Sequence, residues 1–431
     1  MKGYYLNPTL ELKRQGGDFE LFWKDLKTDQ KHREKPSPYD LLALKLVLED
    51  RDLREVAHKE AVSLSVLKGV LRLGVKKGYL LKEPTRVVRS GSPYKEAWFP
   101  GEDFRRSEIF TLQWHLTQRC DLACRHCYDR TDRRPLNLKE ALRVLDRFYD
   151  FCEEMRVQGQ ISFSGGNPFL HPDFFELYRE ASERDFTLAI LGNPVPEAWF
   201  ERILAIEPPA YYQVSLEGLE AYNDFIRGPG HFRRTLSFLE MLKDSGVSAS
   251  VMLTLHAGNV DQVLPLARSL SGRVETFTFN RLALTGEGRK LSPAERDTFF
   301  RLMVEFLEES ANLPHLHLKD NLFNHLLYRK KDELCGGCTG FGCGAAFNFV
   351  ALLPDGEVHA CRKFSSYLGN IFENDLLEIY HSERSEKYRR GPEACYDCRL
   401  YAICRGCLAV IATSGLDPFR DRDPFCPGPV N

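Results

Sequence analysis

The sequence predicts an α/β protein built around a partial (β/α)6 barrel of the TIM type, with a small β+α module before it and a cysteine-rich region after it. Three observations carry this prediction. The chain has 431 residues, about three times the ~150 residues typical of one domain. Strand-like and helical patterns alternate six times in its middle part. None of the 13 cysteines lies in the first 119 residues, and nine of them follow residue 334.

Composition and charge exclude several classes of protein. With 43% hydrophobic and 28% charged residues, the chain is typical of a globular protein rather than a collagen, a coiled coil or a disordered chain. Its longest apolar runs are far shorter than the ~20 residues of a membrane span, and residues 1–12 lack the apolar stretch of a signal peptide. The net charge of −2 predicts no strong attraction to nucleic acid or membranes.

The first 100 residues predict a small, basic module of strands followed by helices. They carry 20 Lys or Arg against 14 Asp or Glu, which suits an anionic partner or simply an uneven charged surface. A turn at Gly16-Gly17 separates two expected strands, and Gly78 ends the last helix. A Gly-, Ser- and Pro-containing linker is expected at 90–101. The expected strands are 10–13, 19–22 and 79–81, and the expected helices are 39–48, 53–57 and 64–75.

The middle of the chain predicts parallel βα units, because each of six strands is followed by a helix. Chemistry then belongs at the carboxyl ends of the strands. We expect the barrel at 105–290, bridging helices at 291–334 and the cysteine-rich domain at 335–431. The expected strands are 110–116, 160–163, 187–191, 212–216, 248–254 and 276–279, and the expected helices are 137–154, 172–184, 196–206, 232–245, 260–270 and 292–310.

Three cysteines, Cys120, Cys124 and Cys127, follow the first barrel strand within eight residues. An odd number of cysteines in a chain without an export signal argues against disulfides and favours metal binding in a reducing cytoplasm. Three thiolates on a four-iron cluster leave one iron without a protein ligand, which can chelate a small molecule. A structural zinc ion is the alternative, but it normally takes four ligands and no fourth cysteine is nearby.

The motif C-x3-C-x2-C after a strand resembles that of the radical S-adenosylmethionine (SAM) enzymes. The resemblance extends over residues 109–290 through weaker motifs after later strands. It implies that the open iron binds the amino and carboxylate groups of SAM, and that reductive cleavage of SAM gives a 5′-deoxyadenosyl radical that abstracts a substrate hydrogen. His126 stands where the family often has an aromatic residue near adenine.

The same resemblance assigns SAM contacts to residues that follow the strands. Gly165-Gly166-Asn167-Pro168 stands for the family's Gly-Gly-Glu-Pro, in which the glycines let the backbone approach the ligand. Val214–Gly218 stands for a Ser-x-Asp-Gly segment, and Arg227-Gly228 for an Arg-Gly pair whose arginine would bind the SAM carboxylate, unless it forms a surface salt bridge. The assigned residues are His126, Gly165, Gly166, Asn167, Asn193, Ser215, Glu217 and Arg227, while Asn193 and also Asn259 could instead be turn or cap residues.

The cysteines after residue 334 resemble the SPASM extension of radical SAM proteins, a seven-cysteine signature for auxiliary clusters. The pattern is C-x12-G-x4-C, then C-x2-C-x5-C-x2-C and a last cysteine, where the family has x3 in place of the final x2. The resemblance implies three [4Fe-4S] clusters in all, although CxxC pairs also suit a zinc ribbon. The first auxiliary cluster would use Cys343, Cys361 and Cys407 with Cys338 or Cys335, or keep an open iron, and the second would use Cys395, Cys398, Cys404 and Cys426. The isolated Cys152 is expected to be a buried free thiol.

These resemblances predict an enzyme that modifies a ribosomally made precursor peptide. The N-terminal module resembles the PqqD-like peptide-recognition (RRE) fold, with a DNA-binding winged helix as the runner-up. Arg362-Lys363 after Cys361 replaces the Asp of sulfatase-maturating members, so we expect peptide maturation, most of all a thioether crosslink from Cys or selenocysteine, as in the selenobiotic-type maturases. A C–C crosslink, a decarboxylation or an oxidation is the alternative.

The expected partners are a precursor peptide whose leader binds the N-terminal module, and an electron donor such as flavodoxin or ferredoxin, in the cytoplasm, with no nucleic acid or membrane. From another class, an iron–sulfur DNA-binding redox regulator would need basic side chains concentrated on one recognition helix. The expected helix at 64–75 contains only Lys68 and Arg72, which disfavours that alternative. The sequence singles out no catalytic base.

Overall fold

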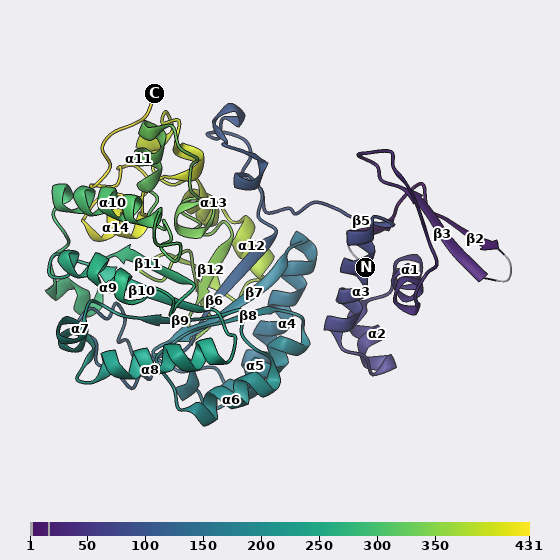
Figure 1. Cartoon of the computed structure of the whole chain (residues 1–431), viewed down its shortest axis with the longest axis horizontal. Coiled ribbons are helices and arrows are strands. Elements are labelled where there is room, and N and C mark those ends of the chain that lie inside the picture. The colour runs from purple at the N-terminus through teal and green to yellow at the C-terminus, as the bar shows by residue number, and fades with distance from the viewer. Residues whose placement is uncertain (1–2, 16–17) are drawn as a thin grey trace.

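The computed structural model describes residues 3–15 and 18–431, so the expected Gly16-Gly17 turn lies outside the described residues. A small N-terminal module stands beside a larger body, and a single segment after β5 connects the two (Figure 1). The body contains the barrel and the cysteine-rich tail, which pack against each other.

The N-terminal module combines two small sheets with three helices. Strands β1 and β5 pair antiparallel, and β2, β3 and β4 form an antiparallel meander. Helix α1 begins with a capping box between Ser37 and Asp40, and α3 ends at Gly78 in the left-handed conformation. The bounds are β1 Tyr4–Leu6, β2 Glu11–Gln15, β3 Asp18–Lys24, β4 Lys31–Glu34, α1 Pro38–Glu49, α2 Leu53–Glu60, α3 Leu64–Lys77 and β5 Leu80–Lys82.

The body confirms the predicted partial barrel. Six parallel strands lie side by side in chain order, from β6 to β11, and helices cover their outer face (Figure 1). The strands are β6 Ile109–Thr117, β7 Gln158–Gly165, β8 Thr187–Leu191, β9 Tyr211–Ser215, β10 Ala249–Leu255 and β11 Thr276–Arg281. The helices are α4 Leu138–Met155, α5 Phe174–Glu183, α6 Glu197–Ile206, α7 Glu220–Arg227, α8 His231–Asp244, α9 Val263–Ser269 and α10 Arg296–Ser310.

The cysteine-rich tail continues the barrel sheet. Strand β12 pairs parallel with β6, and β13 and β14 follow antiparallel, so the sheet has nine strands. This joint places the tail beside the first barrel strand and the loop that follows it. The remaining elements are α11 Phe323–Lys330, β12 Phe349–Leu352, β13 Glu357–His359, β14 Tyr367–Asn370, α12 Leu376–His381, α13 Glu383–Arg390 and α14 Leu408–Thr413.

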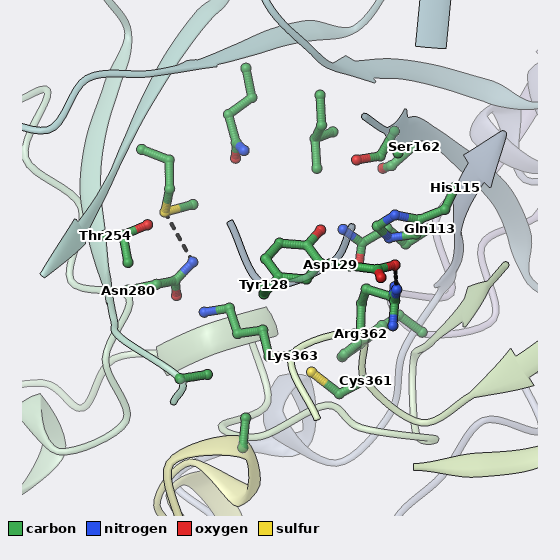
Figure 2. Close-up of a pocket in the computed structure, with 18 of the residues that line it drawn as sticks. Gln113, His115, Tyr128, Asp129, Ser162, Thr254, Asn280, Cys361, Arg362 and Lys363 are labelled. Atoms are coloured by element: carbon green, nitrogen blue, oxygen red, sulfur yellow. Dashed lines mark hydrogen bonds and ion pairs between the residues drawn. The ribbon is translucent and has the colours of Figure 1, made fainter. Parts of the chain in front are cut away.

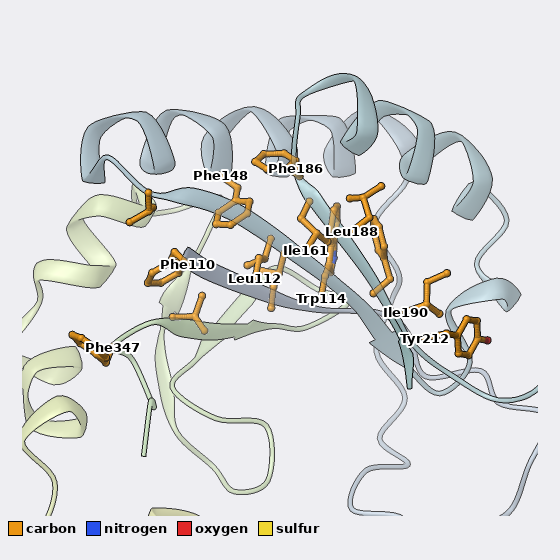
Figure 3. Close-up of a cluster of buried hydrophobic side chains, with 14 of the residues drawn as sticks. Phe110, Leu112, Trp114, Phe148, Ile161, Phe186, Leu188, Ile190, Tyr212 and Phe347 are labelled. Carbon is orange, nitrogen blue, oxygen red and sulfur yellow. The ribbon is translucent and has the colours of Figure 1, made fainter. Parts of the chain in front are cut away.

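An apolar layer between the sheet and its helices fixes the direction of every strand. On β6, Leu112 and Trp114 point to the helices and are buried (Figure 3), so the alternate residues point into the barrel. Phe148 of α4 stacks on Phe186 with ring centroids 5.0 Å apart. Burial of each such side chain contributes roughly 1.5–3 kcal/mol, which is enough to set which residues face the barrel interior.

Candidate functional site

A cavity of about 1190 Å³ occupies the interior of the barrel and opens toward the tail. Inward-facing residues of β6, β7, β9 and β10 line one side, and the loops that carry Cys127 and Cys361 line the other (Figure 2). Of the expected SAM contacts, the cavity is lined by His126, Gly165, Gly166, Asn193, Ser215 and Arg227.

The first thiol set, Cys120, Cys124 and Cys127, lies on the loop after β6, and all three residues line the cavity. The thiols lie within range of one another's charge, because Cys120 and Cys127 each add to the effect of burial in raising the pKa of Cys124. Arg227 Nη1 lies 3.8 Å from Cys124 Sγ. A buried guanidinium beside a thiolate favours the charged form of the thiolate that binds a metal.

Two glycines at the end of β7, Gly165 and Gly166, hold this loop in place. The backbone N–H of Gly166 donates to Thr117 O at 2.8 Å, and a Cβ on Gly166 would lie 2.2 Å from Arg119 O. Any side chain there would push the cysteine loop away from β7. Both glycines also line the cavity. They allow a close approach, as expected, but the atoms that lie nearest to them belong to the backbone where β6 leads into the cysteine loop.

Asn167 differs from its expected role. It is 3% exposed and does not belong to the cavity lining. Its Nδ2 donates to Asp121 Oδ1 at 2.9 Å, and Asn193 Nδ2 donates to the same oxygen at 2.7 Å. Asp121, which lies between the first two cysteines and was not singled out by the sequence, therefore anchors the loop through two amides.

Glu217 and Arg227 form a buried ion pair behind the first thiol set. Arg227 Nη2 lies 2.6 Å from Glu217 Oε1, with side-chain exposures of 9% and 0%. Glu217 also accepts from the backbone N–H of Thr254 at 2.8 Å. Burial alone would raise the pKa of Glu217, but the charges of His126 and Arg227 lower it overall.

This pair corrects two expectations. Glu217 is not part of the cavity lining, and Arg227 is neither a surface residue nor free of a carboxylate partner. Asn259 is a turn residue, because its side chain binds the backbone of His256, Glu217 and Thr254. Polar partners on neighbouring elements, which a single sequence does not reveal, account for these differences.

The second thiol set, Cys338, Cys343, Cys361 and Cys407, lines the same cavity. Burial raises the pKa of Cys361 to about 12, and the charges of Cys407 and Cys343 add to this shift. Cys338 adds in the same way to the shift of Cys407. The four side chains therefore lie within range of one another's charge, and Cys407 is near the other three despite the shortened spacing before it.

The third thiol set, Cys395, Cys398, Cys404 and Cys426, lies deeper in the tail. Burial raises the pKa of Cys404, and Cys395, Cys426 and Cys398 each raise it further.

Cys335 stands apart from all three sets. It does not line the cavity, and its pKa is raised to about 11 by burial with a contribution from Asp320 but from no other described cysteine. Cys152 is buried on α4, as expected of a free thiol.

The donor chemistry of the thiol sets suits iron–sulfur clusters. No group of three His, Cys, Asp or Glu side chains in the described ranges is arranged to hold one metal ion. A structural zinc ion normally takes four ligands, and the first thiol set offers three. Sets of three and four thiols match the cysteine ligation of iron–sulfur clusters.

Basic side chains cover the wall between the first and second thiol sets. Arg362 forms an ion pair with Asp129 beside Tyr128 (Figure 2). Lys363 and Lys319 also line the cavity. On β6, His115 faces this wall with its Nε2 unpaired and 1% of the residue exposed. Burial, together with the charge of Arg362, lowers the pKa of His115 to about 3, so the imidazole is neutral.

The N-terminal module contacts the barrel through charged residues of α3. Lys68 lies 2.9 Å from Glu153, and Arg72 lies 2.6 Å from Asp185. Two of the four basic residues of α3 are therefore engaged with the body, and a third, Lys77, pairs with Asp40 within the module. Within the described part of the chain, no helix has the length and apolar character needed to cross a membrane.

Comparisons with known proteins agree with this geometry. Residues 114–270 match the radical SAM superfamily, and residues 343–408 match the SPASM iron–sulfur cluster-binding domain. The chain is 29% identical to the mycofactocin maturase MftC of Mycolicibacterium smegmatis, over 73% of this chain and 82% of that protein. It is 26% identical to the AdoMet-dependent heme synthase of Methanosarcina barkeri, over 73% of this chain and 95% of that protein.

Solved structures extend the likeness of the fold to the whole chain. Streptococcus suis SuiB bound to the precursor peptide SuiA has a TM-score of 0.60 at 18% identity, covering 98% of this chain and 100% of that one. The anSMEcpe structure with bound AdoMet has a TM-score of 0.57 at 16% identity, covering 73% and 93%. The arrangement of N-terminal module, barrel and tail therefore occurs in a known fold.

Proposed function

Because residues 114–270 match the radical SAM superfamily and residues 343–408 match the SPASM iron–sulfur cluster-binding domain, we propose that the chain is an enzyme that cleaves SAM reductively and modifies a ribosomally made precursor peptide. One observation carries the proposal: the first and second thiol sets line a single cavity of about 1190 Å³. That cavity is large enough for SAM and one side chain of a peptide. A substrate held in it can therefore reach both clusters.

In this proposal the first thiol set holds the SAM-binding [4Fe-4S] cluster, and the second and third sets hold two auxiliary clusters. When bound, the first cluster supplies the electron that splits SAM into methionine and the 5′-deoxyadenosyl radical. The chain's own residues position SAM: Asn193, Ser215 and Arg227 offer polar atoms at the cavity wall. Glu217 fixes the Arg227 side chain, and the barrel walls exclude water from the radical.

The N-terminal module favours a peptide over a small tetrapyrrole as substrate. MftC and the heme synthase both match only 73% of this chain, whereas the likeness to SuiB includes the module. The meander β2-β3-β4 has two sheet edges, and a sheet edge can bind an extended leader as an added strand. Apolar side chains that remain about half exposed in the module include Tyr5, Leu12, Phe19 and Leu48.

The proposal also covers finer features. Residues 1–100 form the leader-binding module, 105–290 the barrel, 291–334 bridging helices and 335–431 the auxiliary-cluster domain. The reaction is a thioether crosslink from Cys or selenocysteine, as in selenobiotic-type maturases, since a peptide thiol can enter the cavity beside the second thiol set. The electron donor is a flavodoxin or ferredoxin, and the enzyme works in the cytoplasm.

Anaerobic reconstitution tests the core of this proposal. We expect about 12 irons per chain, as for three four-iron clusters, and formation of 5′-deoxyadenosine from SAM under a strong reductant. A chain that yields no deoxyadenosine would contradict the proposal, and about four irons would remove the auxiliary clusters. The substrate is tested with the short Cys-containing peptide expected to be encoded beside this gene. A mass loss of two hydrogens together with loss of the free thiol indicates a thioether, the same mass loss with the thiol retained indicates a C–C crosslink, and loss of CO₂ indicates decarboxylation.

A further inference from the structure

Two arginines are buried in the tail without an acidic partner. Arg89, from the segment that follows β5, is 2% exposed, and Arg405, between Cys404 and Cys407, is 1% exposed. Neither guanidinium lies at ion-pair distance from an Asp or Glu within the described residues. The other arginine buried in this region, Arg281, is paired with both Asp320 and Asp423.

The two guanidiniums bind the same backbone carbonyls. Arg89 donates to Phe341 O, to Ala402 O at 2.7 Å and to Cys343 O at 2.8 Å. Arg405 donates to Cys343 O at 2.7 Å, to Ala402 O at 3.0 Å and to Phe341 O at 3.1 Å. Two like charges therefore share one cage of neutral acceptors.

Such an arrangement is unfavourable on its own. Removing a cation from water is costly unless an opposite charge replaces the lost hydration, and the two cations repel each other. Burial, and then the charge of Arg405, lower the pKa of Arg89 to about 9, while the thiolate of Cys343 acts in the opposite direction. Carbonyl groups and the ring of Phe347, 4.3 Å from the Arg89 guanidinium, offset part of this cost but carry no net charge.

The thiol sets on either side of the pair provide the missing negative charge. Cys343, whose carbonyl both arginines bind, belongs to the second thiol set. Arg405 directly follows Cys404 of the third set. Burial raises the pKa of both Cys343 and Cys395, and the charge of Arg405 opposes part of that rise in each. Arg405 is therefore near both sets. A four-iron cluster held by four thiolates carries net negative charge, and nearby charge sets its reduction potential.

We infer that Arg89 and Arg405 together form the counter-charge of the two auxiliary iron–sulfur clusters, and that they raise the reduction potential of at least the cluster held by the second thiol set. This inference rests on the auxiliary clusters of the proposed function. The cation favours the reduced cluster, which carries one more negative charge than the oxidised one. Because Arg89 comes from the segment between the N-terminal module and the barrel, the same contact fastens that segment to the tail.

The test compares three variants of the full-length, anaerobically reconstituted enzyme. Arg89→Gln removes the charge but keeps an amide donor, and Arg89→Lys keeps the charge but loses the planar fork. Arg389→Met is the matched control: Arg389 also donates to two carbonyls of the tail, Ala346 O and Tyr380 O, but its charge is paired with Glu386. Iron content is counted first, and each cluster's potential is then measured by EPR-monitored titration.

We expect R89Q to lower the reduced-to-oxidised ratio of an auxiliary cluster at least tenfold at a fixed potential, which is about 59 mV for a one-electron couple. R89K and R389M stay within threefold of the wild type, and the cluster of the first thiol set is unchanged in all three. Unchanged potentials in a fully loaded R89Q, or an equal shift in R389M, would overturn the inference.

Loading of iron keeps the inference testable where potentials cannot be measured. Loss of auxiliary iron in R89Q, with full loading in R89K and R389M, supports the role of the charge. Loss in both Arg89 variants would overturn it, because the side chain would then act through its shape alone. A wild-type enzyme that binds no auxiliary iron would contradict the proposed function itself. That outcome is seen in the wild type, whereas failure of the inference about Arg89 is seen only in the variants.

Discussion

Glu217 lies at the centre of the polar network behind the first thiol set. It pairs with Arg227, lies 3.3 Å from His126 and binds the backbone of β10 at Thr254. We predict that Glu217→Gln lowers the free energy of unfolding by about 3–5 kcal/mol, because it leaves Arg227 as an unpaired buried charge. Chemical denaturation of the metal-free chain measures this change, and SAM binding to the reconstituted enzyme should weaken with it.

A second glutamate nearby provides the control for this prediction. Glu220 pairs with Arg233, but the side chains are 45% and 79% exposed. Glu220→Gln should cost at most about 1 kcal/mol, as for other surface pairs. An equal cost in both variants would show that burial of the Glu217 pair is not what stabilises it.

Cys335 and Cys338 lie only three positions apart, but we expect their substitutions to differ in their effect on iron binding. The thiol of Cys338 interacts with Cys343 of the second thiol set, whereas the pKa of Cys335 responds to burial and Asp320. We predict that Cys338→Ala loses up to about four irons per chain, while Cys335→Ala keeps the wild-type iron content. Iron and sulfide analysis after identical reconstitution measures both, and a loss in Cys335→Ala alone would reverse the assignment.

At the scale of elements, Asp40 fixes the start of α1. It completes the capping box with Ser37 and accepts from Tyr79 at 2.7 Å and Lys77 at 2.9 Å. Burial alone would raise the pKa of Asp40, but hydrogen bonds from Ser37, Tyr79 and Lys77 lower it overall. A lowered folded-state pKa means that the charge stabilises the module fully above the unfolded pKa of about 3.9, and that this contribution is lost as pH falls through the folded value.

We therefore predict that Asp40→Asn lowers the opening free energy of α1 by roughly 1–3 kcal/mol near pH 6 and that the difference from the wild type shrinks below about pH 4. Hydrogen exchange of α1 peptides, resolved by mass spectrometry, measures it. Asp52→Asn is the control, because Asp52 caps α2 from a half-exposed position and Asn caps a helix equally well. A pH-independent difference would contradict the predicted role of the Asp40 charge.

The sequence predicted best those helices and strands whose boundaries depend on local sequence signals. Strand β8 has the bounds expected for it, and α4 begins one residue after the expected start, because Asn137 provides a capping box. Helix α7 was not expected, since a Gly-rich stretch follows it closely. The pairing of β12 with β6 was also missed, because it joins residues more than 200 positions apart, and no local signal encodes such a contact.

The residues of the candidate site also differ in how well the sequence predicted their positions. Cysteine spacing predicted the first thiol set, since its three members share one loop. The resemblance to the SPASM extension supplied the members of the second and third sets, with Cys335 and Cys338 left as alternatives. Side chains whose roles depend on distant partners were harder to place. Asn167 faces Asp121 instead of the cavity, and Glu217 faces Arg227, because both are satisfied by polar groups that lie on other elements.

At the scale of the whole molecule, peptide recognition and radical chemistry are assigned to separate parts of the chain. The cavity is lined by residues between Ser107 and Ala409, and the described residues of the N-terminal module contribute nothing to it. The module contacts the barrel through ion pairs such as Lys68–Glu153 and Arg54–Asp150. Exposed ion pairs contribute only about 0–1 kcal/mol each, so we expect the body to remain folded without the module.

This separation gives a prediction for a shortened chain. Removal of residues 1–84 keeps Arg89 and every cysteine, so we expect iron content and deoxyadenosine formation within about twofold of the full chain. Modification of the precursor peptide should show a KM at least tenfold higher, equivalent to about 1.4 kcal/mol of lost binding, with kcat little changed, because the leader loses its strand partner but the cavity is intact. A peptide without its leader should show no difference between the two chains. An unchanged KM for the complete precursor would mean that the leader binds to the barrel or the tail instead of the module.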